Sequence, residues 1–149
     1  MNDKMITTDS ITINASPARV WDVLVNPAMT RKYMFDCEAL SNWQPGSRLE
    51  WKGAADGKVY VKGNIVEIEK DKLLRYTVFD PNGDLDDVPS NYLTVTYNLS
   101  RQDGHGTLLQ VSQGDFAKVQ NGQQRYQDTL NGWGTVLNKI KELAEEDAG

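Results

Sequence analysis

The sequence predicts an α+β domain in which a curved antiparallel sheet of about six or seven strands wraps around one long C-terminal helix. Three observations predict this fold. Between residues 37 and 113 apolar residues recur with a period of two, and short turns separate the runs. Between residues 122 and 146 they recur with helical spacing. The remaining helical pattern forms two short helices directly after the first strand, so helices and strands do not alternate along the chain.

The N-terminal segment is expected to form one strand and two short helices. Residues 5–13 carry isoleucines among threonines, which is typical of a strand. Ser16 is a preferred N-cap residue, and Pro17 suits the first position of a helix. Apolar residues then recur at helical spacing, at Val20, Trp21 and Leu24. An Asn-Pro pair ends this helix, and a second one is expected over residues 28–34.

Six further strands are predicted in the middle of the chain, over residues 37–43, 48–53, 58–70, 72–79, 92–101 and 107–113. The turn signals between them are Pro45-Gly46, Asp56-Gly57, Asn82-Gly83 and Asp103-Gly104. Short turns between consecutive strands indicate an antiparallel meander. The clearest alternation puts one face of residues 92–101 in the core, with Leu93, Val95, Tyr97 and Leu99.

The last element is predicted as one continuous helix over residues 122–146. Asn121 and Gln124 resemble a capping box, and about 25 residues span roughly 37 Å. Trp133 stands between two glycines in mid-helix, where each glycine costs about 1 kcal/mol relative to alanine. We therefore expect close packing or a neighbouring void at Trp133. Since one helix cannot fill a strongly bent sheet along its whole length, a pocket is expected where the helix leaves the sheet.

Composition bounds the classes of function. The 149 residues suit one domain over residues 1–149. A net charge of −5 argues against nucleic acid and anionic membrane surfaces as partners. Cys37 is the only cysteine, so no internal disulfide can form, and neither an apolar leader nor a membrane-length segment occurs. These features favour a cytoplasmic location without membrane insertion.

The side chains expected to line the pocket are mainly aromatic. They are Tyr33, Met34, Trp51, Tyr60, Tyr76, Phe79, Tyr97, Gln113, Phe116, Leu130 and Trp133. Buried tyrosine hydroxyls need partners, which suggests a pocket with a few polar groups. By strand alternation the Gln113 amide faces inward and needs water or a ligand. The alternative interpretation places these aromatics in a closed core, with Tyr33 and Met34 sealing its bottom.

No metal or cofactor site is expected. Residues 80–87 begin like an EF-hand loop, but Leu85 and Asn91 occupy the positions that require Gly and a bidentate Glu. We interpret the segment as a solvated acidic loop. His105, the single histidine, lies at a hairpin tip, and with Cys37 alone it supplies too few ligands for a metal.

Four segments resemble one known family. Residues 43–51 (WQPGSRLEW) look like the Pro-Gly-Gly hairpin of the activator of heat-shock-protein-90 ATPase homologue family, within the START, polyketide-cyclase and birch-allergen-like (SRPBCC) superfamily. The other three segments, in the order expected along nearly the whole chain, are 13–21, 63–76 and 130–144. Ser47 replaces the second glycine, and Asp71-Lys72 replaces a double proline; both departures fall in turns.

The resemblance implies a helix-grip fold with a cavity, and it carries over no catalytic residue. Non-catalytic binding of a small apolar or amphipathic molecule is therefore the first functional hypothesis. A second, implied by the family, is a co-chaperone that stimulates a heat-shock-protein-90 ATPase; the eukaryotic co-chaperone has an additional N-terminal domain, for which 149 residues leave no room. A third is a cyclase or hydrolase using Tyr76, Tyr97, Gln113 or Glu50, none with an identifiable activating partner. A homodimer through an edge strand or the terminal helix stays open.

Overall fold

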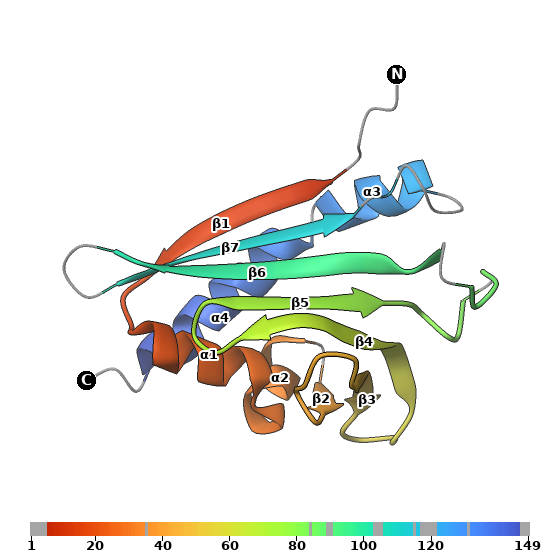
Figure 1. The fold of residues 1–149 in the computed structure, drawn as a ribbon, viewed down its shortest axis with the longest axis horizontal. Coiled ribbons are helices and arrows are strands. Elements are labelled where there is room, and N and C mark those ends of the chain that lie inside the picture. Colours follow the sequence, from red (N-terminus) through yellow and green to blue (C-terminus); the bar gives the residue numbers. More distant parts are fainter. Residues whose placement is uncertain are drawn as a thin grey trace.

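A seven-stranded antiparallel sheet forms the framework of the molecule (Figure 1). The strand order is β1-β7-β6-β5-β4-β3-β2, so all neighbours except β1 and β7 are consecutive in the chain. The strands are β1 (Thr7–Ile13), β2 (Cys37–Ser41), β3 (Arg48–Gly53), β4 (Val59–Glu69), β5 (Leu73–Val78), β6 (Leu93–Arg101) and β7 (Thr107–Gly114). The predicted α+β helix-grip fold is confirmed.

This computed structural model describes residues 6–34, 36–83, 85–88, 91–102, 106–114, 116, 122–130 and 132–146. The side chains of Asp128 and Leu130 are also outside the described part. The proposed capping residue Asn121 and the single histidine, His105, lie outside the described residues as well.

Two short helices follow β1, as predicted: α1 (Pro17–Val25) and α2 (Pro27–Tyr33). The Ser16 hydroxyl caps α1 by accepting a hydrogen bond from the Arg19 amide at 3.2 Å. Asn26 serves both helices, because it ends α1 and its side-chain oxygen accepts a hydrogen bond from the Ala28 amide at 3.0 Å to begin α2. This double use of one residue allows the sharp turn between the helices.

The sheet bends along β4. The first half of β4 pairs with β3 and the second half with β5, and the register shifts between Ile65 and Glu67. Figure 1 shows β4 curving away from β5 and continuing towards β3. Gly63 lies at the bend, where a Cβ atom would sit only 1.7 Å from the Thr77 carbonyl oxygen. The bend carries β2 and β3 out of the plane of the other strands and opens space beside the C-terminal helix.

The C-terminal helical segment is divided in two, so the prediction of one continuous helix is wrong in this respect. Helix α3 (Gly122–Leu130) ends before a turn at Gly132, whose amide donates to the Thr129 carbonyl at 3.0 Å, and α4 (Trp133–Glu146) begins at the next residue. Gly134 is exposed, and a Cβ atom there would meet nothing within 4 Å. Close packing therefore does not explain this glycine. No helix among the described residues is long and apolar enough to cross a membrane.

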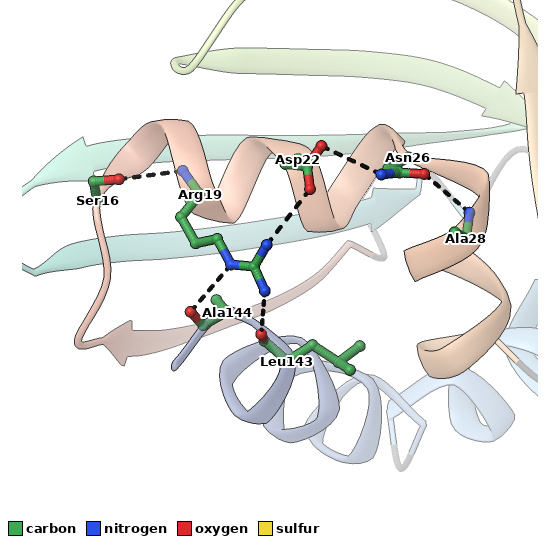
Figure 2. A network of polar contacts seen from close by, with 7 residues as sticks. All are labelled: Ser16, Arg19, Asp22, Asn26, Ala28, Leu143 and Ala144. Atoms are coloured by element: carbon green, nitrogen blue, oxygen red, sulfur yellow. Dashed lines mark hydrogen bonds and ion pairs between the residues drawn. The ribbon is translucent and has the colours of Figure 1, made fainter. Parts of the chain in front are cut away.

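Arg19 joins the beginning of α1 to the end of α4 (Figure 2). Its guanidinium donates to the carbonyl oxygens of Leu143 at 3.0 Å and Ala144 at 3.4 Å, and it pairs with Asp22 at 3.6 Å. Carbonyl groups at a helix C-terminus lack intrahelical partners, and a cation there also complements the helix dipole. The contact fixes α4 against α1 and thereby holds Trp133 at the far end of α4.

Candidate functional site

A cavity of about 630 Å³ opens between the bent sheet and the beginning of α4. This volume lies within the range typical of small-molecule sites. Its walls come from strands β2 to β7, from the chain after α2, from the β3–β4 turn, and from Trp133 of α4. The void expected beside Trp133 is therefore present.

The cavity brings together part of the set of residues predicted from the sequence. The predicted residues that line it are Met34, Trp51, Tyr60, Tyr76, Gln113 and Trp133. Four others, Tyr33, Phe79, Tyr97 and Phe116, are buried but lie outside the cavity lining. Leu130 ends α3, and its side chain lies outside the described part of the structure.

Three of the four buried aromatics outside the lining make contacts elsewhere in the core. The Tyr33 hydroxyl donates to the Leu24 carbonyl at 2.9 Å, which ties α2 to α1 in the core. Phe79 stacks on Tyr92 with ring centroids 4.9 Å apart. Phe116 and Leu93 form a separate small apolar cluster, and Val78 and Tyr126 pack against it. For these residues the closed-core alternative describes their position.

Gln113 and Trp133 form the principal polar contact in the cavity wall. The indole Nε1–H of Trp133 donates to the side-chain oxygen of Gln113 at 2.9 Å. Strand alternation predicts that this amide faces inward and needs water or a ligand. In the structure its oxygen has a protein partner, Trp133. The amide NH₂ group has no hydrogen-bond partner among the described residues, which leaves two donors at the cavity wall.

Four aromatic rings contact one another in a row, and three of them line the cavity. Ring centroids are 6.1 Å apart for Trp51 and Tyr76, 6.3 Å for Tyr76 and Tyr97, and 5.8 Å for Tyr97 and Trp133. The Tyr97 hydroxyl is buried without a hydrogen-bond partner among the described residues. Burial raises its pKa well above the ordinary value, and the nearby Tyr76 raises it further although the two hydroxyls are not in hydrogen-bonding geometry. Burial also raises the pKa of Tyr76, so both phenols stay protonated.

Two exposed residues of the cavity lining, Asp36 and Asp56, were not predicted as pocket residues. Asp56 accepts hydrogen bonds from the Tyr60 hydroxyl and from the Lys58 amide, and these contacts lower the pKa of its carboxyl. A side chain at Gly53 would collide with Asp56, since a Cβ atom there lies 2.3 Å from the Asp56 carboxylate. Asp36 pairs with Arg31 at 3.4 Å.

The remaining lining residues are small or aliphatic, namely Cys37, Ala55, Val61, Val78 and Val95. Burial is the main cause that raises the pKa of the Cys37 thiol, and Asp36 and Asp56 raise it further. The thiol therefore stays protonated and is a weak nucleophile. No lysine, arginine or histidine belongs to the described lining, so apart from the exposed carboxylates of Asp36 and Asp56 the lining offers apolar contacts and neutral hydrogen bonds.

Sequence patterns could have identified some of the missed residues. Val95 shares the buried face of β6 with Tyr97, and the alternation already placed both inward. Asp56 was recognised as part of a turn, but no local pattern shows that this turn stands beside a cavity. Asp36 has a left-handed backbone with φ of 64°. Aspartate tolerates this region, but only a minority of aspartates adopt it, so the residue type alone does not reveal it.

Comparisons with known proteins agree with this architecture. A family model described as Activator of Hsp90 ATPase homolog 1-like protein matches residues 14–145. The solved structure of ChR145 from Cytophaga hutchinsonii is 31% identical over 98% of this chain and 97% of that chain, with a TM-score of 0.77. No curated protein matches the sequence significantly.

Two more distant structures share the fold. MLL2253 from Mesorhizobium loti is 19% identical over 95% of this chain and 98% of that chain, with a TM-score of 0.75. The Aha1 dimer from Colwellia psychrerythraea is 13% identical over 97% of this chain and 98% of that chain, with a TM-score of 0.72. Identities this low support similarity of architecture alone.

Proposed function

This chain belongs to the Activator of Hsp90 ATPase homolog 1-like family, and with that membership as premise we propose that it binds a small apolar or amphipathic molecule without transforming it. The observation that carries the proposal is the cavity of about 630 Å³ beside Trp133. Its wall combines aromatic and aliphatic side chains with one amide whose NH₂ group has no hydrogen-bond partner among the described residues, and such a mixture is usual in small-molecule sites.

The ionisation of the buried groups in and beside the cavity supports binding rather than catalysis. A general base or nucleophile must be deprotonated, or easily deprotonated, near neutral pH. The raised pKa values of Cys37, Tyr76 and Tyr97 point the other way. Glu50, the remaining candidate, lies outside the described lining and pairs with Arg48 at 3.2 Å.

A ligand screen tests the proposal. The purified protein is examined by native mass spectrometry before and after denaturation, and its melting temperature is measured with lipids, phenols and polyketide-like aromatics. A ligand present at 100 times its dissociation constant stabilises the folded state by about 2.7 kcal/mol. Absence of any co-purified molecule, together with an unchanged melting temperature for every compound, would contradict the proposal.

A matched pair of variants shows whether a shift arises in the cavity. Val78 lines the cavity, whereas Val66 on β4 is 49% exposed. Val78→Phe should remove most of the ligand-induced shift by occupying the space, and Val66→Phe should retain it. Equal shifts in both variants would place binding elsewhere on the molecule.

A second candidate follows from the family match over residues 14–145: stimulation of a heat-shock-protein-90 ATPase by protein contact. ATP turnover by a chaperone from the same organism, measured with and without excess of this chain, tests it. Unchanged turnover removes this candidate. Size-exclusion chromatography of the chain alone establishes whether it forms a dimer, as the Aha1 structure from Colwellia psychrerythraea does.

A further inference from the structure

We infer that the molecule bound in the cavity is uncharged, contains a planar ring system, and carries a hydrogen-bond acceptor that the side-chain amide of Gln113 holds. The inference rests on the proposed function and adds the chemical class of the ligand. Three properties of the cavity carry it: the fixed orientation of one amide, the aromatic walls, and the distribution of charge.

The orientation of the Gln113 amide is determined by its partner. An indole N–H can only donate, so the atom that faces Trp133 Nε1 at 2.9 Å must be the amide oxygen. The NH₂ group then faces away from the indole, and in the described part of the chain it has no hydrogen bond. Because Gln113 lines the cavity, this NH₂ group offers donors, and no acceptor, to a bound molecule.

The walls around this donor favour rings. Trp51, Tyr76 and Trp133 all line the cavity, and they come from β3, β5 and α4, so they approach it from separate elements of the fold. Trp133 is further fixed by Gln113 and by an edge-to-face contact with Tyr97 at an interplanar angle of 86°. Aromatic rings held in this way contact planar ligands through stacked or edge-to-face arrangements.

The charges exclude ions from the interior. The lining contains no cationic side chain among the described residues, so a buried carboxylate would lose its hydration without gaining a partner. The lining carboxylates Asp36 and Asp56 add repulsion. They do not provide a free site for a cation either, because both are exposed and already engaged, by Arg31 and by Tyr60 with the Lys58 amide.

Four probes of nearly the same shape separate these properties. They are 2-acetonaphthone, which has an acceptor; 2-ethylnaphthalene, which has none; 2-naphthoate, an anion; and 2-naphthylmethylammonium, a cation. Dissociation constants come from quenching of tryptophan fluorescence and from calorimetry. We expect 2-acetonaphthone to bind about three- to tenfold more tightly than 2-ethylnaphthalene, as one neutral hydrogen bond allows. Both ions should bind at least roughly thirtyfold more weakly than the ketone.

Two variants of β7 test the part played by the amide. Gln113→Glu keeps an oxygen for Trp133 and removes the donors, so the preference for 2-acetonaphthone over 2-ethylnaphthalene should fall to about onefold. Gln110→Glu makes the same change at an exposed position of the same strand and should retain the preference. The melting temperature of each variant without probe shows whether the fold is kept.

The results distinguish a failure of this inference from a failure of the proposed function on which it rests. Equal binding of the two neutral probes, or tighter binding of either ion, overturns the inference and leaves small-molecule binding in place. Loss of the preference in Gln110→Glu as well as in Gln113→Glu overturns the role of the amide. Failure of all four probes, with no shift in the wider screen, overturns the proposed function and the inference together. The wild-type comparison decides the ligand class even if Gln113→Glu does not fold.

Discussion

At the scale of single residues, Gly63 shows how one missing side chain permits the bend of the sheet. A Cβ atom there would lie 1.7 Å from the Thr77 carbonyl oxygen, and this oxygen cannot move without moving β5. Gly63→Ala should therefore lower the free energy of unfolding by at least about 2 kcal/mol, as a backbone collision in the core requires. Denaturation in urea measures the change.

The control for this substitution is Gly83→Ala, in the turn after Phe79. A Cβ atom at Gly83 would be 3.6 Å or more from its neighbours, which is ordinary contact. We expect a change within about 0.5 kcal/mol there. If Gly63→Ala were as harmless as Gly83→Ala, the close approach of β4 and β5 would not be the reason for glycine at position 63.

Glu145 supplies a contact whose contribution depends on pH. Its carboxylate accepts hydrogen bonds from Lys141 and from the Asn14 amide, the latter at 2.7 Å, and these contacts hold the pKa below the ordinary value of 4.5. A carboxyl whose pKa is lowered by folding stabilises the folded state above its unfolded pKa. That contribution is lost as the pH falls through the folded value.

We expect Glu145→Gln to destabilise the protein by about 0.5–1 kcal/mol at pH 7. The difference from the wild type should shrink as the pH falls below about 4.5. Urea denaturation at a series of pH values measures it. Glu142→Gln is the control, because Glu142 lies on the exposed side of α4 and pairs only with Lys139, at 3.7 Å, among the contacts described. A difference that stayed constant down to acid pH would contradict this account.

At the scale of elements, the break between α3 and α4 places Trp133 at the start of a helix. Gly134, in the first turn of α4, does not have a left-handed backbone, and a Cβ atom added there would meet nothing within 4 Å. Gly134→Ala should therefore raise the free energy of unfolding by up to about 1 kcal/mol, because alanine loses less backbone entropy in a helix. Chemical denaturation checks this. A destabilisation would indicate that Gly134 packs more closely than its exposed position suggests.

Most elements could be predicted from the sequence because their signals are local. Ser16 and Pro17 mark the start of α1, and the alternation of Leu93 with Val95 marks β6, within the span of a few residues. The break at Gly132 could not be predicted, since the apolar residues keep their helical spacing across it. The contacts that hold α4 are tertiary, with Arg19 at one end and Gln113 at the other, and a local pattern does not show them.

At the scale of the whole molecule, the site was harder to predict than the fold. Alternation shows that a side chain points inward, but it does not distinguish packed space from open space. Tyr76 and Tyr97 follow the same inward pattern on neighbouring strands, yet Tyr76 lines the cavity and Tyr97 lies outside the lining. Whether an inward side chain meets open space depends on the elements around it, and the lining is drawn from β2 to β7 and from Trp133 of α4. Such an arrangement combines segments far apart in the chain, so no short segment encodes it.

The cavity should also decide whether a substitution that adds one methylene group raises or lowers the free energy of unfolding. Val95→Ile places the group towards the open space, and it should raise the free energy of unfolding by up to about 0.8 kcal/mol. Val23→Ile makes the same change in α1, where Val23 is fully buried in packed core outside the cavity lining, and it should lower that free energy by about 1 kcal/mol or more. Urea denaturation of both variants measures the contrast. Since ligand and added methylene compete for the same space, Val95→Ile should also reduce the stabilisation by a bound probe. Destabilisation by both substitutions would mean that the sheet closes on α4 in solution.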